Sequence, residues 1–221
     1  MFESSWPQLQ ISKLSRIMQV AIIANGSILN YPKTKERLTN FDRIIAADGG
    51  LLHCKSMAVM PDLVIGDMDS ISEEELLIYS NCEKVTFPKD KDKTDLELAV
   101  EKALKDGTNS ITLFGALGRR IDHSISNLQL LCRHPEIITI ESQYETIHAI
   151  ANTQIIRTSK NQTVSLFSIS ANGCTITTKG LKWDVENTQL NERFMSISNV
   201  CPEGKFEIIV HDGIALCSLC S

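Results

Sequence analysis

Four short apolar runs recur in the first half of the chain, and each stops at glycine or at a short polar residue. They cover residues 20–24, 44–47, 63–65 and 111–114. A segment long enough to hold a helix separates each run from the next. Short apolar strands that alternate with helices predict an N-terminal α/β domain built on a parallel sheet.

Two later segments carry clear helix signals. The first helix is predicted to begin at Thr94, because Thr94 and Glu97 form a capping-box signature and apolar residues at 96, 99, 100, 103 and 104 share one face. Gly107 is predicted to end it. The second helix is predicted over residues 122–132, and residues 137–140 are the last strand expected in this part. The predicted buried side of the second helix consists of Ile121, Ile125, Leu128 and Cys132.

The pattern changes to strict alternation after about residue 150. Strands are predicted at residues 163–169, 174–178, 194–197 and 205–210, with glycine-containing turns at 172–173, 203–204 and 212–213. No helix is expected there, so the tail reads as an all-β sandwich. We therefore expect a poorly ordered extension over residues 1–16, the parallel-sheet α/β domain over residues 17–147 and a C-terminal β-sandwich domain over residues 148–221.

Composition limits the kinds of partner. The net charge of −5 over 221 residues argues against broad binding to nucleic acid or to anionic membranes, so we expect a small-molecule partner. No apolar stretch is long enough for a membrane span. Seven cysteines are an odd number in a chain without a secretory signal, which predicts reduced thiols in a cytoplasmic protein. The lone pair Cys217 and Cys220 lacks the second pair that a zinc site needs.

Two acids follow the third apolar run. Gly66 allows a sharp turn after Ile65 and places Asp67 and Asp69 on one side of an extended segment, which suits a hard cation. The alternative is a strand end followed by a helix cap, with Ser70 or Ser72 capping the acidic run at residues 73–75. The Asp-x-Asp pattern alone leaves both interpretations open.

The position of the acids in the predicted sheet favours the metal. Ligands bind beyond the carboxyl ends of parallel strands, where Asp48, Asp67 and Asp69 are expected to converge. Asp95 lies in the first turn of the Thr94 helix, whose N-terminus also suits a phosphate. Carboxylates that lie close together repel one another unless a cation intervenes, and an all-oxygen ligand set favours Mg²⁺.

Two segments could bind the phosphates that accompany such a metal. Residues 88–95 place three lysines beside the Thr94 helix, and residues 115–127 combine a glycine-rich turn, two arginines and a helix start. The alternative for the lysines is a solvated charged loop. His123 could equally be an ordinary surface or core histidine.

The ordered motifs resemble those of the thiamine pyrophosphokinase family. The resemblance covers roughly residues 20–215. It rests on Asp48-Gly49-Gly50, Gly66-Asp67-Met68-Asp69-Ser70, Lys91-Asp92-Lys93-Thr94-Asp95, Gly115-Ala116-Leu117-Gly118 and Arg120-Ile121-Asp122-His123, with Gly180-Leu181-Lys182-Trp183 and Ser196-Ile197-Ser198-Asn199 in the tail.

This resemblance implies Mg²⁺-dependent transfer of a pyrophosphoryl group from ATP to the hydroxyl of thiamine, giving thiamine diphosphate and AMP. It implies that Asp48, Asp67, Asp69 and Asp95 hold the metal and the phosphates. The residues implied to bind the nucleotide are Gly26, Gly49, Lys93, Thr94, Gly115, Arg120, Asp122, His123 and Asn127. Trp183, Ser198 and Asn199 would bind thiamine. The family also implies a homodimer in which the α/β domain of one subunit faces the β domain of the other.

Two positions depart from the family pattern, and other functions stay open. Arg119 stands where the family usually has glycine, and Val200 where a polar residue is frequent. Trp183 could instead be a core residue of the β domain. The rival functions are a diphosphokinase for another heteroaromatic alcohol such as a hydroxymethylpterin, and a non-catalytic nucleotide sensor. A metal phosphohydrolase is a third, although histidines would then be expected among the ligands.

Overall fold

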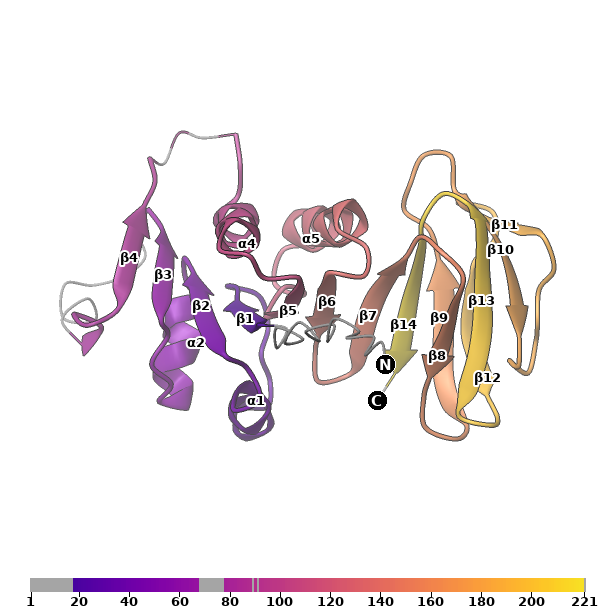
Figure 1. Ribbon diagram of the computed structural model, residues 1–221, viewed down its shortest axis with the longest axis horizontal. Coiled ribbons are helices and arrows are strands. Elements are labelled where there is room, and N and C mark those ends of the chain that lie inside the picture. The colour runs from indigo at the N-terminus through magenta and orange to yellow at the C-terminus, as the bar shows by residue number, and fades with distance from the viewer. Residues whose placement is uncertain (1–17, 68–77, 89, 91, 221) are drawn as a thin grey trace, which may run out of the picture.

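The computed structural model describes residues 18–67, 78–88, 90 and 92–220. Asp69, Lys89, Lys91, the alternative cap at Ser70 or Ser72 and the expected extension over residues 1–16 lie outside the described residues. Figure 1 shows one long mixed sheet with helices on both faces of one half and a second sheet packed on the other half. This arrangement confirms an α/β part followed by a β-sandwich.

The α/β half is a parallel sheet in the order β4-β3-β2-β1-β5-β6. Its strands are β1 (Gln19–Ile23), β2 (Arg43–Ala47), β3 (Leu63–Gly66), β4 (Glu83–Thr86), β5 (Ser110–Phe114) and β6 (Ile138–Glu141). Helices α1 (Tyr31–Leu38) and α2 (Gly50–Met57) cover one face, and α4 (Asp95–Lys105) and α5 (Ile121–Arg133) cover the other (Figure 1). The strand order reverses between β1 and β5, which is where open α/β sheets bind ligands.

Strand β7 (Glu145–Ile150) continues the same sheet into the sandwich. It pairs antiparallel with β6 on one side and with β14 (Ala215–Cys220) on the other, and β9 (Gln162–Phe167) and β12 (Ser196–Cys201) follow. The second sheet has the order β11-β10-β13-β8. Its strands are β8 (Gln154–Arg157), β10 (Cys174–Lys179), β11 (Thr188–Leu190) and β13 (Lys205–Asp212). A separate apolar core, which includes Ile176, Leu166 and Phe206, lies between the two sheets.

Most sequence signals in the α/β half correctly predicted its helices and strands. Thr94 is the N-cap of α4, and its hydroxyl accepts a hydrogen bond from the Glu97 amide at 3.2 Å, as the capping box predicts. The four apolar runs all form strands. All seven cysteines are free thiols. Among the described residues, no helix combines the length and the apolar character that crossing a membrane requires.

The predicted buried side of α5 was wrong for two of its four residues. Ile121 is 76 % exposed and Ile125 is 48 % exposed, while Leu130 and Leu131 pack into the core. The buried face of α5 includes Asn127 as well as Leu130 and Leu131, and the Asn127 side-chain amide donates a hydrogen bond to the Ala116 carbonyl at 2.7 Å. Leu128 and Cys132 are only partly buried.

The strand predictions for the tail were incomplete. The strand expected at residues 194–197 begins instead at Ser196, because Phe194 forms only an isolated bridge with Asn191. The patterns also failed to indicate β8, β11 and β14 in the tail, and β4 and β7 before it. Strands β8 and β11 are edge strands of three or four residues, too short to establish an alternating pattern.

Candidate active site

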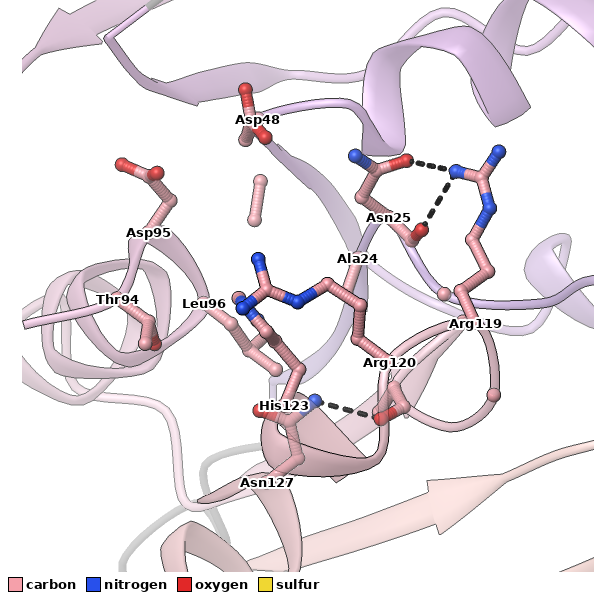
Figure 2. Close-up of a pocket in the computed structure, with 15 residues that line it drawn as sticks. Ala24, Asn25, Asp48, Thr94, Asp95, Leu96, Arg119, Arg120, His123 and Asn127 are labelled. Carbon is pink, nitrogen blue, oxygen red and sulfur yellow. Dashed lines mark hydrogen bonds between the residues drawn. The ribbon is translucent and has the colours of Figure 1, made fainter. Parts of the chain in front are cut away.

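A cavity of about 450 Å³ lies at the carboxyl ends of β1, β2 and β5, at the point where the strand order reverses (Figure 2). The first residues of α4 and α5 complete its wall. Eight of the residues expected to bind metal or nucleotide line it. They are Gly26, Asp48, Thr94, Asp95, Gly115, Arg120, His123 and Asn127.

The floor of the cavity is formed by two loops that touch through their main chains. The Gly26 amide donates to the Gly115 carbonyl at 2.6 Å, and the Ser27 amide donates to the Leu117 carbonyl at 2.7 Å. A Cβ on Gly26 would lie 2.2 Å from the Gly115 oxygen, and one on Gly115 would lie 2.5 Å from the Ala24 oxygen. These two glycines are therefore required by the close approach of the loops that follow β1 and β5.

Gly115→Ala is expected to destabilise the protein more than Gly107→Ala. Both glycines have positive φ, +63° and +90°, so each alanine costs about 1–2 kcal/mol in backbone conformation. No atom lies within 4 Å of the new Cβ at Gly107, whereas the one at Gly115 meets the Ala24 carbonyl, which adds about 1–3 kcal/mol. Urea unfolding of both variants measures the difference. Equal destabilisation would show that the contact between the loops does not matter.

Two of the expected acidic residues face the cavity together. Asp48 follows β2 with φ +48°, its amide donates to the Ile65 carbonyl at 2.7 Å, and Asp95 opens α4. Figure 2 shows the two carboxylates on the same side of the cavity. Asp67 follows Gly66, whose Cβ position lies 3.2 Å from the Asp48 Cα, but Asp67 does not line the cavity. Asp69 is outside the described part of the chain.

The acids suit Mg²⁺ only as a metal shared with substrate. Over residues 18–67, 78–88, 90 and 92–220 no group of three or more His, Cys, Asp and Glu side chains is arranged to hold an ion. Mg²⁺, however, is commonly bound by one or two carboxylates together with substrate phosphates and water. Asp48 and Asp95 supply that number of carboxylates, with oxygen donors of the right kind.

The expected basic residues are divided between the cavity and other partners. Arg120 lines the cavity, but its Nε donates to Asp122 at 3.1 Å as part of an exposed ion pair, and the pair lowers the pKa of Asp122. Asp122 itself does not line the cavity. Lys93 also lies outside it and pairs with Glu101 at 2.6 Å. Gly49, the remaining expected nucleotide residue, is the N-cap of α2.

Asn25, to which the sequence patterns assigned no role, lines the cavity. Arg119, one of the two arginines in the expected phosphate-binding segment at residues 115–127, lines it as well. Arg119 Nη1 donates to the Asn25 side-chain oxygen at 2.8 Å and to its carbonyl at 3.1 Å (Figure 2). Asn25 follows β1, and Arg119 lies in the loop that follows β5. Each residue follows the carboxyl end of one of these two neighbouring strands, and this position is the sequence feature that could have predicted its place in the cavity.

The His53 side chain forms a hydrogen bond to the main chain of the Gly26 loop. Its Nε2 lies 2.9 Å from the Gly26 carbonyl, which can only accept, so Nε2 carries the proton and Nδ1 accepts from the Tyr31 hydroxyl at 2.8 Å. Burial lowers the pKa of His53, and the charge of Arg119 lowers it further, against the effect of the hydrogen bond to Gly26. A neutral His53 therefore fits this arrangement.

The residues expected to bind thiamine gather at the far end of the long sheet. Trp183 lies in the loop between β10 and β11, is 56 % exposed and carries the Lys182 ammonium 4.5 Å above its ring. Trp183 is therefore not a core residue. Ser198 is exposed, has φ +59° and lies where the register of β12 against β9 shifts.

Asn199 holds the Trp183 loop in place. Its side chain is buried, accepts from the Trp183 and Val200 amides at 3.2 and 2.8 Å, and donates to the Trp183 carbonyl at 2.7 Å. Its amide also donates to the Ser196 hydroxyl at 3.3 Å. Because both ends of this amide already have protein partners, Asn199 is built into the loop.

The cavity and Trp183 are far apart within one chain. Six strand-to-strand steps separate β12, which anchors the Trp183 loop, from β1, which borders the cavity. At a spacing of about 4.8 Å per step, the separation is about 29 Å. Figure 1 shows β12 and β1 well apart along the longest axis of the molecule.

Two family models match consecutive parts of the chain. Residues 34–142 match "Thiamin pyrophosphokinase, catalytic domain", and residues 148–215 match "Thiamin pyrophosphokinase, vitamin B1 binding domain". Curated relatives agree. The chain is 32 % identical over 162 residues to Thiamine pyrophosphokinase 1 of Oryza sativa subsp. japonica and 32 % identical over 165 residues to Thiamine pyrophosphokinase 1 of Arabidopsis thaliana. These matches cover 66 % and 67 % of this chain but only 61 % of each relative.

Solved structures share the fold. The crystal structure of thiamine pyrophosphokinase from Bacillus subtilis superposes with a TM-score of 0.78 at 22 % identity, covering 92 % of this chain and 99 % of that chain. The crystal structure of yeast thiamin pyrophosphokinase gives a TM-score of 0.80 at 16 % identity, covering 95 % and 88 %. At these identities the similarity establishes the fold alone.

Proposed function

We propose, on the premise that this chain belongs to the thiamin pyrophosphokinase family, that it transfers a pyrophosphoryl group from ATP to the hydroxyl of thiamine. The products would be thiamine diphosphate and AMP. The observation that carries the proposal is the cavity at the switch point of the sheet, where Asp48 and Asp95 lie opposite Arg120 and where Arg119, held by Asn25, also lines the wall. This arrangement suits a charged polyphosphate, which needs cations on one side and carboxylates to hold its metal.

The side chains of the cavity would act mainly by positioning charge. Asp48 and Asp95 would hold Mg²⁺, as would Asp67 and Asp69 by their place in the motif, and a bound Mg²⁺ would neutralise the polyphosphate and polarise its phosphorus–oxygen bonds. Thr94, Gly26, Gly115 and Asn127 would shape the nucleotide site. Phosphoryl transfer depends mostly on alignment of the attacking and leaving oxygens. The main-chain contact between the two floor loops would help this alignment by fixing the shape of the nucleotide site.

Trp183 is proposed as the surface on which thiamine stacks. An exposed indole favours an aromatic, cationic ligand through stacking and cation–π attraction. The Lys182 ammonium lies over the ring, so thiamine stacked on that face would displace it. Ser198 would contact the ligand, while Asn199 would position Trp183. We place this site within residues 148–221 and the nucleotide site within residues 17–147.

The separation of about 29 Å between β12, which anchors the Trp183 loop, and β1, which borders the cavity, argues for a homodimer. Transfer requires both substrates to be in contact, so the indole that serves one cavity must come from a second chain. Large exposed apolar side chains lie at both places, as expected for surfaces that meet. They are Ile121 and Ile125 beside the cavity, and Trp183, Phe194, Met195 and Ile197 on the sandwich.

The rival substrate is another heteroaromatic alcohol, and the rival class is a nucleotide sensor. Purified protein incubated with ATP, Mg²⁺ and either thiamine or a hydroxymethylpterin is expected to release AMP only with thiamine. AMP release only with the pterin would overturn the choice of acceptor. Nucleotide binding without AMP release from any acceptor would favour the sensor.

A further inference from the structure

Arg119 has a backbone conformation that its residue type does not favour. Its φ is +59°, directly after Gly118 at +84°, so two successive residues are left-handed. Non-glycine residues pay a conformational cost there, and only Asn and Asp commonly recover part of it through local hydrogen bonds. Arginine has no such local compensation. Strain of this kind persists where the surrounding structure or a ligand uses the side chain.

Among the residues that the structure describes, only Asn25 accepts hydrogen bonds from the Arg119 side chain. Both recorded hydrogen bonds come from Nη1, at 2.8 Å to the Asn25 side chain and 3.1 Å to its carbonyl. Within the described ranges no carboxylate lies within 4.0 Å of the guanidinium, and no acceptor is found for Nε or Nη2. A guanidinium carries five N–H donors in a planar fork, so most of its capacity to bind an anion remains.

Arg120 differs from Arg119 in this respect. Its guanidinium already faces the Asp122 carboxylate through both Nε and Nη2. An incoming phosphate would have to compete with that carboxylate. Both arginines line the cavity, but the positive charge of Arg119 is not neutralised by a carboxylate of the described residues.

From this contrast we propose that Arg119 is an anion-binding residue of this chain, whose guanidinium contacts the polyphosphate of the nucleotide while Asn25 holds it in place. The proposal rests on the function proposed above. It explains why a side chain is retained at a left-handed position that would suit glycine. Asn25 thereby becomes the residue that orients Arg119 toward the ligand.

The test compares Arg119→Gly with wild type for binding of three probes: ATP with Mg²⁺, inorganic tripolyphosphate with Mg²⁺, and adenosine. Each is measured by competition against a fluorescent ATP analogue. Loss of charge-assisted hydrogen bonds is expected to weaken ATP and tripolyphosphate about tenfold and to leave adenosine unchanged. Arg119→Lys keeps a positive charge without the planar fork of donors, so its affinities for ATP and tripolyphosphate are expected to lie between those of wild type and Arg119→Gly. Thermal unfolding of Arg119→Gly is expected at or above the wild-type temperature, because glycine suits φ +59°.

Ala58→Gly is the matched control. Ala58 is also left-handed, with φ +49°, and is exposed at the C-terminus of α2, away from the cavity. It is expected to relieve the same kind of strain without changing binding of any probe. Equal weakening of adenosine and tripolyphosphate by Arg119→Gly would mean that Arg119 only shapes the loop, and unchanged tripolyphosphate binding would mean that it contacts no anion. Either result overturns the proposal, as does failure of the wild type to bind tripolyphosphate.

The failure of the proposed function has a different signature. If wild-type protein binds ATP but releases no AMP with thiamine, the acceptor or the reaction is misassigned. The three binding constants still decide the role of Arg119 in that case, because none of them requires thiamine.

Discussion

Asp48→Asn is expected to lower kcat for AMP release by about 10²–10³ while the protein remains folded, because a group that holds charge around a transferring phosphoryl unit is lost. Asparagine has nearly the same shape and tolerates the left-handed backbone of Asp48, where φ is +48°. The hydrogen bond from the residue 48 amide to the Ile65 carbonyl is kept. Steady-state kinetics with ATP and thiamine, together with urea unfolding, measure both quantities.

Asp62→Asn is the matched control for this variant. Asp62 directly precedes β3, at the N-terminal ends of the parallel strands, whereas the cavity lies at their carboxyl ends. Its carboxylate accepts a hydrogen bond from the Ile44 amide at 2.7 Å. The asparagine oxygen can accept the same bond, so kcat is expected to stay at the wild-type value. Near-normal turnover of Asp48→Asn would contradict the assignment of Asp48 to the metal and phosphates.

Trp183→Ala is expected to raise KM for thiamine about tenfold to a hundredfold and to leave KM for ATP unchanged, because loss of stacking and cation–π attraction removes about 1–3 kcal/mol. Trp183 is more than half exposed, so the substitution leaves no core cavity and stability is expected to be retained. Trp183→Phe keeps an aromatic face and is expected to lie nearer to wild type. An equal rise in both KM values would place Trp183 elsewhere in the mechanism.

The sequence was most informative where a single strong pattern determines the structure. The run at residues 63–65 is apolar and bounded by polar residues and glycine, and it forms β3 because both faces of a parallel sheet are buried. Asp48 was expected at the carboxyl end of its strand and Asp95 in the first turn of the Thr94 helix, and both line one cavity. Asp67, which was expected to converge with Asp48, does not line it.

The features that the sequence did not reveal depend on tertiary partners. Asn127, a polar residue, takes a place on the buried face of α5 because its amide bonds to Ala116, whereas the apolar Ile121 and Ile125 are exposed. The contact of Arg119 with Asn25 joins residues 94 positions apart. Asn199 carries no sequence signal that separates a ligand contact from the buried support of Trp183 that the structure shows.

The proposed sharing of one active site between two chains has a direct test. Asp48→Asn and Trp183→Ala are each assayed alone at low thiamine, where both are expected to be nearly inactive, and then as a 1:1 mixture after subunit exchange. Half of the dimers would be mixed, and each would contain one intact site of two, so the mixture is expected to recover about a quarter of wild-type activity. Activity no higher than the average of the two variants would contradict the account, because it would mean that the cavity and the indole that serve one reaction belong to the same chain.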